Sequence, residues 1–577
     1  MKINLVPTFL AAAISFAAAG ISYGQNPLFI PDTLSGTTIG LTVQTGSKTF
    51  FPGFTTPTFG YNGDFLGPTL LMNKGDSVTL NVTNSLNTST TVHWHGFHVA
   101  PENDGGPHQA ILPGTTWSPS FKIRNEAATY WYHPHGEGKT EIQVSKGLAG
   151  LIIIRDSAEA SYALPRTYGV DDFPLILQSK AFDVLQQIAI ATHEDSIMIV
   201  NGTIDPTLEV PKQVVRLRVL NGSADRTYYL GMSDNSDFHL IASDGGLLSQ
   251  PIQTNRVRLS TGERAEMLID FNAYSVGQSV NLVSYSSELP RGIIGADSVG
   301  TVTNPIGEGY YSNPLNGLDF SLVRFDVAVA TNNPVVAIPS SFAPLIPMDT
   351  LAVNAHRYLH FGADTTQFGE VALVDGPFHM NNDPFEMDSI NITIPLNNKE
   401  IWTLTNSTKV AHPFHIHDIQ FFVLDINGTP PPPQYAGLKD VILVKPDDTL
   451  RFITQFVTFA DDSVPYMYHC HLLHHEDDGM MGQFLVVNTA TSVPGNTTND
   501  FAVSLYPNPA SDHISLDFGD RPVSQNYLEI LDAYGRVLIE QRLAPDGKLK
   551  IEGLVAGFYF VRINGRDGIK TLKFLKQ

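Results

Sequence analysis

The sequence predicts an all-β protein made of three β-sandwich domains with Greek-key connections and a small C-terminal β-sandwich. First, Gly (47) and Pro (38) recur between short Val-, Thr- and Leu-rich runs, the pattern of strands joined by tight turns. Second, helical periodicity of any length is hard to find. Third, the chain contains an internal repeat, and its 577 residues are enough for three or four domains.

The first and third copies of the repeat align residue by residue. Val78–Asn84 in the first copy is followed nine residues later by His93. Ile401–Asn406 in the third copy is followed nine residues later by His415. The same spacing after the same strand pattern predicts that the two histidines occupy equivalent positions.

The middle copy has the scaffold without the histidines. Its strand pattern is Val215–Asn221, and Leu230 stands at the matching offset. We place the copies at residues 25–160, 161–335 and 336–490, each about the size of a Greek-key β-sandwich.

The charge of the chain limits its partners. Lys and Arg number 35 against 57 Asp and Glu, a net charge of -22. We therefore expect no nucleic acid or anionic membrane as partner, and the balance mildly favours cationic or neutral small molecules.

The first 24 residues have the pattern of a secretory signal peptide. Lys2 precedes a mostly apolar run from Phe9 to Ala19, and a cleavage site is expected near Gly24. The alternative is a poorly ordered apolar N-terminus. No later segment reaches the length of a transmembrane helix, so we expect an exported protein without a transmembrane segment.

The composition changes after a short polar linker, residues 491–500. Alternating strands in residues 501–577 predict a small separate β-sandwich. Tyr506–Asp512, Asp532–Val537 and Gly557–Val561 resemble the C-terminal sorting domain of type IX secretion. The resemblance implies that this domain is an export address read by the type IX secretion machinery. The alternative is an ordinary accessory sandwich.

The only cysteine, Cys470, lies between His469 and His471. On a strand, successive side chains point to opposite faces, so Cys470 would face away from both histidines. His475 follows Cys470 by five residues and Met480 by ten. A thiolate, two imidazoles and a weak axial thioether are the ligands of a blue copper centre, and this stretch supplies three of the four. The alternative is a buried free cysteine beside surface histidines.

Ten of the nineteen histidines fall in four short motifs. On a strand, histidines two residues apart share a face at roughly 6.5 Å, which suits two neighbouring metal ions. One such pair is a weak signal, but several in two copies of a repeat are a strong one. The motifs are His93/His95, His133/His135, His412/His415/His417 and His469/His471/His475.

With these motifs, about residues 30 to 490 resemble the three-domain multicopper oxidases, which include laccase-like, cuprous-oxidase-like and bilirubin-oxidase-like enzymes. The resemblance implies three cupredoxin-like domains and four coppers per chain, one of type 1, one of type 2 and two of type 3. The implied ligands are His412, Cys470, His475 and Met480 for type 1, His93 and His415 for type 2, and His95, His133, His135, His417, His469 and His471 for type 3. Met481 is the alternative to Met480, whose offset from Cys470 fits the family.

The resemblance also implies a mechanism. A reducing substrate gives single electrons to the type 1 copper, and Cys470 passes them through a neighbouring histidine to the three-copper cluster, where dioxygen becomes water. Asp104 and Glu476 occupy the positions of acids that relay protons. Their alternative role is that of turn-forming surface acids.

The substrate is less defined. Asp440 resembles an acid near the type 1 site that holds a cationic substrate, although it is equally a strand-edge charge. Residues 332–344 lack the methionine-rich insertion of dedicated cuprous oxidases. We therefore expect a phenol or aromatic amine oxidase, secreted or at the cell surface after export through the periplasm. The alternatives are a Cu(I), Fe(II) or bilirubin oxidase and a non-catalytic copper-binding electron carrier.

Overall fold

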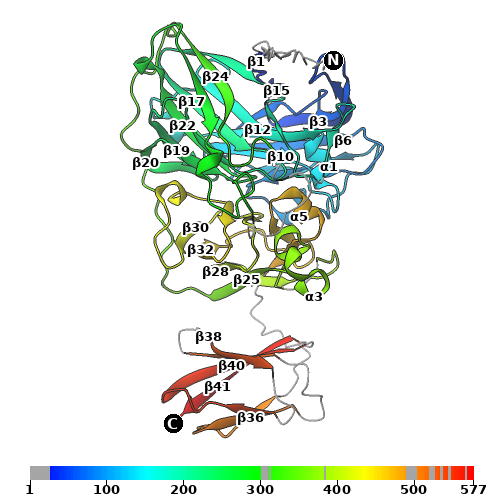
Figure 1. Cartoon of the computed structure of the whole chain (residues 1–577), viewed down its shortest axis with the longest axis vertical. Coiled ribbons are helices and arrows are strands. Elements are labelled where there is room, and N and C mark those ends of the chain that lie inside the picture. The colour runs from blue at the N-terminus through cyan, green and yellow to red at the C-terminus, as the bar shows by residue number, and fades with distance from the viewer. Residues whose placement is uncertain are drawn as a thin grey trace, which may run out of the picture. The chain divides into compact units, whose positions relative to one another are not determined.

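The computed structural model describes residues 26–190, 192–299, 310, 313–381, 385–488, 503–518, 527–532, 537–542, 547–565 and 568–577. Strands are the main regular structure of these residues and helices are few and short, which confirms the all-β prediction (Figure 1). The chain divides into two compact units, Met1–Asn488 and Thr489–Gln577. The predicted signal peptide and the predicted linker lie outside the described residues.

The first part of the larger unit has two sheets around one core. In β6 the residues alternate between buried and partly exposed, so Leu80 and Val82 point into this core with Trp94. One sheet has the order β2 (Thr33–Ser35), β5 (Thr69–Asn73), β11 (Gly150–Arg155), β10 (Ala128–His133), β7 (His93–His95). The other has β4 (Thr56–Tyr61), β3 (Thr38–Lys48), β6 (Ser77–Asn84), β8 (Thr116–Trp117), with β9 (Ser120–Lys122) also on β6.

The middle part also has two sheets, and its central strand β17 is buried along its whole length. The buried Arg218 on β17 is paired with Asp172 at 2.7 Å and with Glu266 at 2.7 Å, so its charge is compensated. One sheet has the order β1 (Asn26–Pro27), β16 (Pro206–Pro211), β24 (Phe320–Ala328), β23 (Ser279–Ser284), β18 (Tyr228–Met232), β21 (Val257–Leu259). The other has β15 (Thr203–Ile204), β14 (Ile197–Val200), β12 (Asp172–Phe182), β17 (Val214–Asn221), β22 (Arg264–Asp270), β19 (Phe238–Ser243), β20 (Gly246–Thr254), with β13 (Ile188–Ala189) on β12.

The third part repeats the arrangement around a core that contains Trp402, Phe452 and Cys470. One sheet has the order β26 (Phe378–Met380), β25 (Ala355–Ala363), β28 (Lys399–Asn406), β32 (Thr449–Gln455), β30 (Phe422–Ile426). The other has β27 (Ile392–Pro395), β34 (Met481–Val487), β33 (Tyr466–Cys470), β29 (His412–Ile416), β31 (Val441–Val444). The short helices of the larger unit include α1 (Thr140–Ser145), α2 (Ser157–Ala160), α3 (Thr365–Phe368), α4 (Ala372–Asp375) and α5 (Leu473–Asp477).

Helices α1 and α5 join the first and third parts and lie side by side in Figure 1. The Asp477 carboxylate accepts the backbone N–H groups of Thr140 at 2.9 Å and Glu141 at 3.0 Å. The first N–H groups of a helix have no partner within the helix. Asp477 of the third part therefore supplies hydrogen-bond acceptors for helix α1 of the first part. This contact holds the two ligand-bearing parts of the chain against each other.

The smaller unit is a separate two-layer β structure with its own core, which includes Ile514, Val561 and Phe574. Its sheets are β35 (Ser504–Tyr506), β36 (His513–Asp517), β39 (Lys548–Lys550) and β38 (Val537–Arg542), β37 (Tyr527–Leu531), β40 (Gly557–Gly565), β41 (Gly568–Lys576). Among the described residues of the whole chain, no helix is long and apolar enough to span a membrane.

Candidate metal centres

Two pairs of neighbouring strands bring the histidine motifs together. β7 pairs antiparallel with β10, so that His93 lies opposite His133. β29 pairs antiparallel with β33, so that His415 lies opposite His469. Directly paired residues of two antiparallel strands share a face of the sheet. Each histidine motif therefore meets the second motif of its own repeat copy.

The eight histidines predicted to bind the type 2 and type 3 coppers form one buried cluster. None is more than 1% exposed. Ring nitrogen atoms lie within 4.8 Å of one another inside three groups, which are His93/His415/His417, His95/His133/His471 and His135/His417/His469. The first and third parts of the chain contribute to every group, so the cluster exists only where they meet.

Five of the eight rings have their Nδ1 atom at an oxygen outside the cluster, which leaves the Nε2 atom facing inward. When Nδ1–H donates to an oxygen, the Nε2 atom carries a free lone pair and can bind a metal. The oxygens within reach of Nδ1 are Asp104 O for His93 at 2.9 Å, Pro134 O for His133 at 2.8 Å, Asp440 O for His415 at 2.8 Å, Asp104 Oδ2 for His417 at 2.6 Å and Cys470 O for His469 at 3.0 Å.

The cluster has the electrostatic properties of a metal site. Burial lowers the pKa of all eight imidazoles, that of His93 to about 3, so the rings are neutral as a metal requires. The Nε2 atoms of His135, His417, His469 and His471 have no hydrogen-bond partner among the described residues. Buried polar atoms are seldom left unpaired, and imidazole nitrogen is a good ligand for copper. The residues therefore fit a cluster of copper ions.

A second candidate site surrounds Cys470. Its Sγ atom lies 3.5 Å from His412 Nδ1 and 3.6 Å from His475 Nδ1, and all three side chains are buried. Thr408 Oγ1 is 2.8 Å from His412 Nε2, which leaves the Nδ1 atom of His412 facing the sulfur. Burial raises the pKa of the thiol, so a metal would bind here with release of its proton. A thiolate with two imidazoles fits a type 1 copper.

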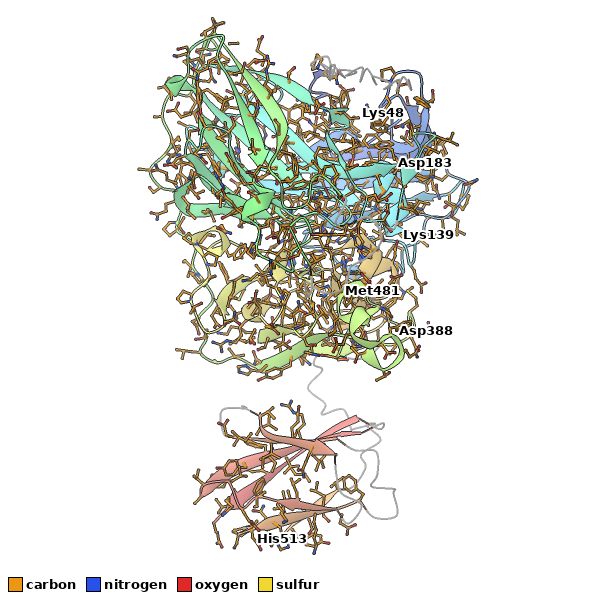
Figure 2. The ribbon with its side chains drawn as sticks, viewed as in Figure 1. Lys48, Lys139, Asp183, Asp388, Met481 and His513 are labelled. Carbon is orange, nitrogen blue, oxygen red and sulfur yellow. The ribbon has the colours of Figure 1, made fainter. Side chains whose placement is uncertain are left out.

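The fold favours Met480 over Met481 as the axial group. Met481 lies opposite His469 in the pairing of β33 with β34, and so it shares the face of the histidine cluster. Met480 precedes it by one residue and alternates to the face of Cys470. The Met480 carbonyl also accepts the Cys470 N–H at 3.0 Å. Figure 2 labels Met481, four residues beyond the end of α5.

Asp104 and Glu476 are buried against the histidine cluster and are not surface acids. Asp104 Oδ2 lies 2.6 Å from His417 Nδ1, and burial raises the pKa of Asp104 to about 6 against the attraction of His93. The two oxygens of Glu476 each lie 3.2 Å from a ring nitrogen, of His135 and His469. Burial raises the pKa of Glu476 well above its usual value. Both carboxyl groups therefore contact histidines that are candidate metal ligands.

The prediction that Asp440 holds a cationic substrate is wrong. Its side chain is fully buried and paired with Arg264, with 2.6 Å between Nη1 and Oδ1. Its Oδ1 atom also lies 3.2 Å from His95 Nε2, in the histidine cluster and not at the surface beside Cys470. A carboxylate enclosed in this way has no free oxygen for a substrate.

A cavity of about 510 Å³ opens beside the Cys470 site and is lined by His475. Its acidic lining residues are Glu141, Glu194, Asp225, Asp375, Asp477 and Asp478, and no Lys or Arg of the described residues lines it. His474 also lines it and lies 2.7 Å from Asp225. Burial opposes protonation of His474, but the ion pair with Asp225 outweighs it and raises the pKa of His474 to about 9.

Three residues with clear roles at these sites carry no signal in the sequence. Thr408 orients His412, and Thr140 donates to Glu476 Oε1 at 2.6 Å. Arg264 reaches the cluster from the middle part. Thr140 and Arg264 act on residues far away in the sequence, and Thr408 is a common amino acid in a stretch without a recognisable motif. No regular spacing in the sequence identifies any of the three.

Family models match the two parts of the chain that supply these histidines. Family models described as multicopper oxidase match residues 42–159 and 352–490. A model described as a secretion system C-terminal sorting domain matches residues 504–577.

The similar proteins cover most of the chain. The multicopper oxidase mco of Staphylococcus haemolyticus is 33% identical over 81% of this chain and 94% of its own length. The cell division protein FtsP of Escherichia coli is 30% identical over 82% of this chain and 95% of its own. The structure of a laccase-like multicopper oxidase, CueO from Ochrobactrum sp., is 34% identical, with a TM-score of 0.69, and covers 80% of this chain and 100% of its own.

The two methionines give a matched test of the axial position. We expect Met480→Leu to leave copper bound at Cys470 and to raise its reduction potential, because a weak thioether donor is lost. Met481→Leu removes the same group one residue away and should leave the potential unchanged. Redox titration of the visible absorption checks both. A shift in the Met481 variant alone would assign the axial role to Met481.

Proposed function

The chain belongs to the multicopper oxidase family, and we propose that it oxidises a small organic reductant and reduces dioxygen to water. One observation carries the proposal. Eight buried histidines with converging nitrogens include His469 and His471, which flank Cys470 in the sequence. Cys470 is buried and faces two further histidines. An electron carrier needs only the second site, whereas dioxygen reduction needs both.

Twelve residues would hold the metal, four coppers per chain. His412, Cys470, His475 and Met480 would hold the type 1 copper, His93 and His415 the type 2 copper, and His95, His133, His135, His417, His469 and His471 the type 3 pair. When bound, copper supplies one-electron oxidation at the first place and four-electron reduction of dioxygen at the second.

The chain connects and shields the two places. Cys470 is on β33 between His469 and His471, so a single residue of backbone links the thiol to each imidazole. All three side chains are fully buried, which keeps water away from the path between them. Their fixed positions at the end of β33 and directly after it would let electrons cross without movement of the protein.

Asp104 and Glu476 would handle the protons. Reduction of one dioxygen to two waters consumes four protons with the four electrons. Both carboxyl groups lie at the cluster, and burial raises the pKa of Asp104 to about 6 and that of Glu476 well above its usual value, which favours proton uptake by both. A buried acid of this kind can deliver a proton and be reloaded, which is general acid catalysis.

Substrate would approach through the acidic cavity, because His475 links its wall to Cys470. We propose a phenol or aromatic amine as reductant, and the carboxylates favour an amine that carries a separate cationic group. A Cu(I) or Fe(II) ion is the alternative of the same charge. Bilirubin, an anion, is disfavoured by the same lining.

The C-terminal unit would direct the protein outward. It matches a secretion sorting domain and, among the described residues, contributes nothing to either metal site. Together with the predicted signal peptide it supports passage through the periplasm by the type IX secretion machinery. The destination would be the medium or the cell surface.

Copper content and oxygen uptake test the function. The purified protein should contain four coppers per chain, show an intense blue colour and consume dioxygen with an aromatic amine. Cys470→Ser should remove the colour and the uptake but leave the copper of the histidine cluster. A wild-type protein with one copper or none would instead be a carrier or a non-catalytic protein, whatever its relatives do.

Asp104→Asn tests the proton relay. The amide keeps an oxygen for His417 but cannot donate a carboxyl proton, so copper and colour should be retained. Reduction by substrate should be unaffected, while reoxidation by dioxygen should slow by about 100-fold. Stopped-flow measurement of the two half-reactions separates them. Reoxidation at the normal rate would leave Glu476 as the relay acid.

The charge of the cavity predicts a preference among substrates. Glu194→Gln with Asp478→Asn should lower kcat/KM for a cationic amine by roughly fivefold and raise it for an anionic reductant. Salt should reduce the difference, because it screens exposed charges. Asp205→Asn with Glu209→Gln removes equal charge from exposed positions outside the cavity and is the control. Equal effects of the two double variants would contradict a role of this cavity.

A further inference from the structure

None of the twelve metal-ligand candidates lies in the middle part, yet its Arg264 holds an acid that contacts the histidine cluster. The guanidinium group is fully buried and holds both carboxylate oxygens of Asp440, at 2.6 Å and 2.7 Å. Its other contacts are the carbonyl oxygens of Thr129 at 3.2 Å, Gly262 at 3.0 Å and Asp244 at 3.1 Å. Arg264 therefore contacts all three parts of the larger unit.

Asp440 transmits this contact to histidines of both ligand-bearing parts. Its Oδ1 atom lies 3.2 Å from His95 Nε2, and its backbone carbonyl lies 2.8 Å from His415 Nδ1. Because Arg264 holds the carboxylate at both oxygens, the oxygen that faces His95 has a fixed position.

His95 differs from the neighbouring rings in orientation. Its Nδ1 atom lies 3.3 Å from His133 Nε2, inside the cluster, and its Nε2 atom faces Asp440. His93, His133 and His415 have the opposite arrangement, with Nδ1 at a carbonyl oxygen. An imidazole binds a metal only through the nitrogen without a proton, so His95 needs its proton on Nε2.

The residue after His95 leaves room for this contact. A Cβ atom on Gly96 would lie 2.4 Å from Asp440 Oδ2 and 2.9 Å from Arg264 Nη2, and its φ of 82° favours glycine. A side chain at position 96 would therefore clash with the ion pair of Arg264 and Asp440.

We propose that Arg264 and Asp440 are a positioning pair through which the ligand-free middle part fixes the tautomer and orientation of His95. Asp440 accepts the Nε2 proton, and Arg264 holds Asp440 in place. The Nδ1 atom of His95 is thereby presented to the cluster. The inference extends the proposed function, but its main test uses the protein without copper and does not depend on oxidase activity.

The test compares Asp440→Asn with Asp244→Asn. Both aspartates are fully buried and contact Arg264, but Asp244 accepts the backbone N–H of Arg264 at 2.8 Å and those of Asp440 and Val441 at 3.3 Å. Among the described residues, Asp244 makes no hydrogen bond or ion pair with a histidine of the cluster. In Asp440→Asn the amide has one acceptor oxygen, for which Arg264 and His95 compete. We expect His95 to lose its preference for the Nε2–H tautomer in this variant only.

Nitrogen NMR of the copper-free protein with ¹⁵N-labelled histidine reads the tautomer directly. The His95 signals are assigned by their loss in His95→Gln. The spectrum of the wild type is a test by itself. It must show His95 protonated on Nε2, and His93 and His133 protonated on Nδ1. A proton on Nδ1 of His95 in the wild type overturns the inference even if a variant does not fold.

Copper binding gives a second readout. Asp440→Asn should weaken binding at the cluster by roughly 10- to 100-fold, the usual effect of losing a partner behind a ligand, and leave the Cys470 site filled. An unchanged tautomer in both variants, or an equal change in both, would mean that the ion pair only joins the parts of the fold. If the tautomer behaves as expected but dioxygen is not reduced, the proposed function fails and the positioning role stands.

Discussion

The structure depends on keeping eight neutral imidazoles in a dry interior with several nitrogen atoms unpaired. A buried polar group without a partner costs about 1–3 kcal/mol, so the fold alone gains nothing from this arrangement. The cost is understandable if metal ions accept those lone pairs. The carbonyl oxygens of Asp104, Pro134 and Asp440 hold rings from outside and leave their inner nitrogens free.

The three parts of the larger unit divide the work. The first and third supply ligands on paired strands, and the Asp477 contact with α1 holds them together. The middle part supplies Arg264, which links all three. A repeat copy that supplies none of the ligand candidates thus still contributes to the site. The third part places His475 between Cys470 and an acidic cavity, which is the proposed entrance for substrate.

The histidine cluster could be predicted from sequence because its signal is local. Histidines two residues apart on a strand share a face, and the repeat indicated that the first and third copies hold them at equivalent positions. Met480 was favoured by its offset in the family resemblance, and the pairing of β33 with β34 favours the same residue. Asp440 could not be placed, because its ion-pair partner Arg264 is 176 residues away in the sequence. The acidic cavity combines segments near residues 141, 193, 225, 375 and 478, and no stretch of sequence contains it.

The proposed function requires that the converging nitrogens and the Cys470 sulfur bind four copper ions. Anomalous diffraction from crystals of the copper-loaded protein, measured on both sides of the copper absorption edge, locates such ions. We expect one peak among His412, Cys470 and His475 and three peaks within the eight-histidine cluster, one of them near Nδ1 of His95. A map with a peak at Cys470 and none in the histidine cluster, at full copper loading, would contradict it.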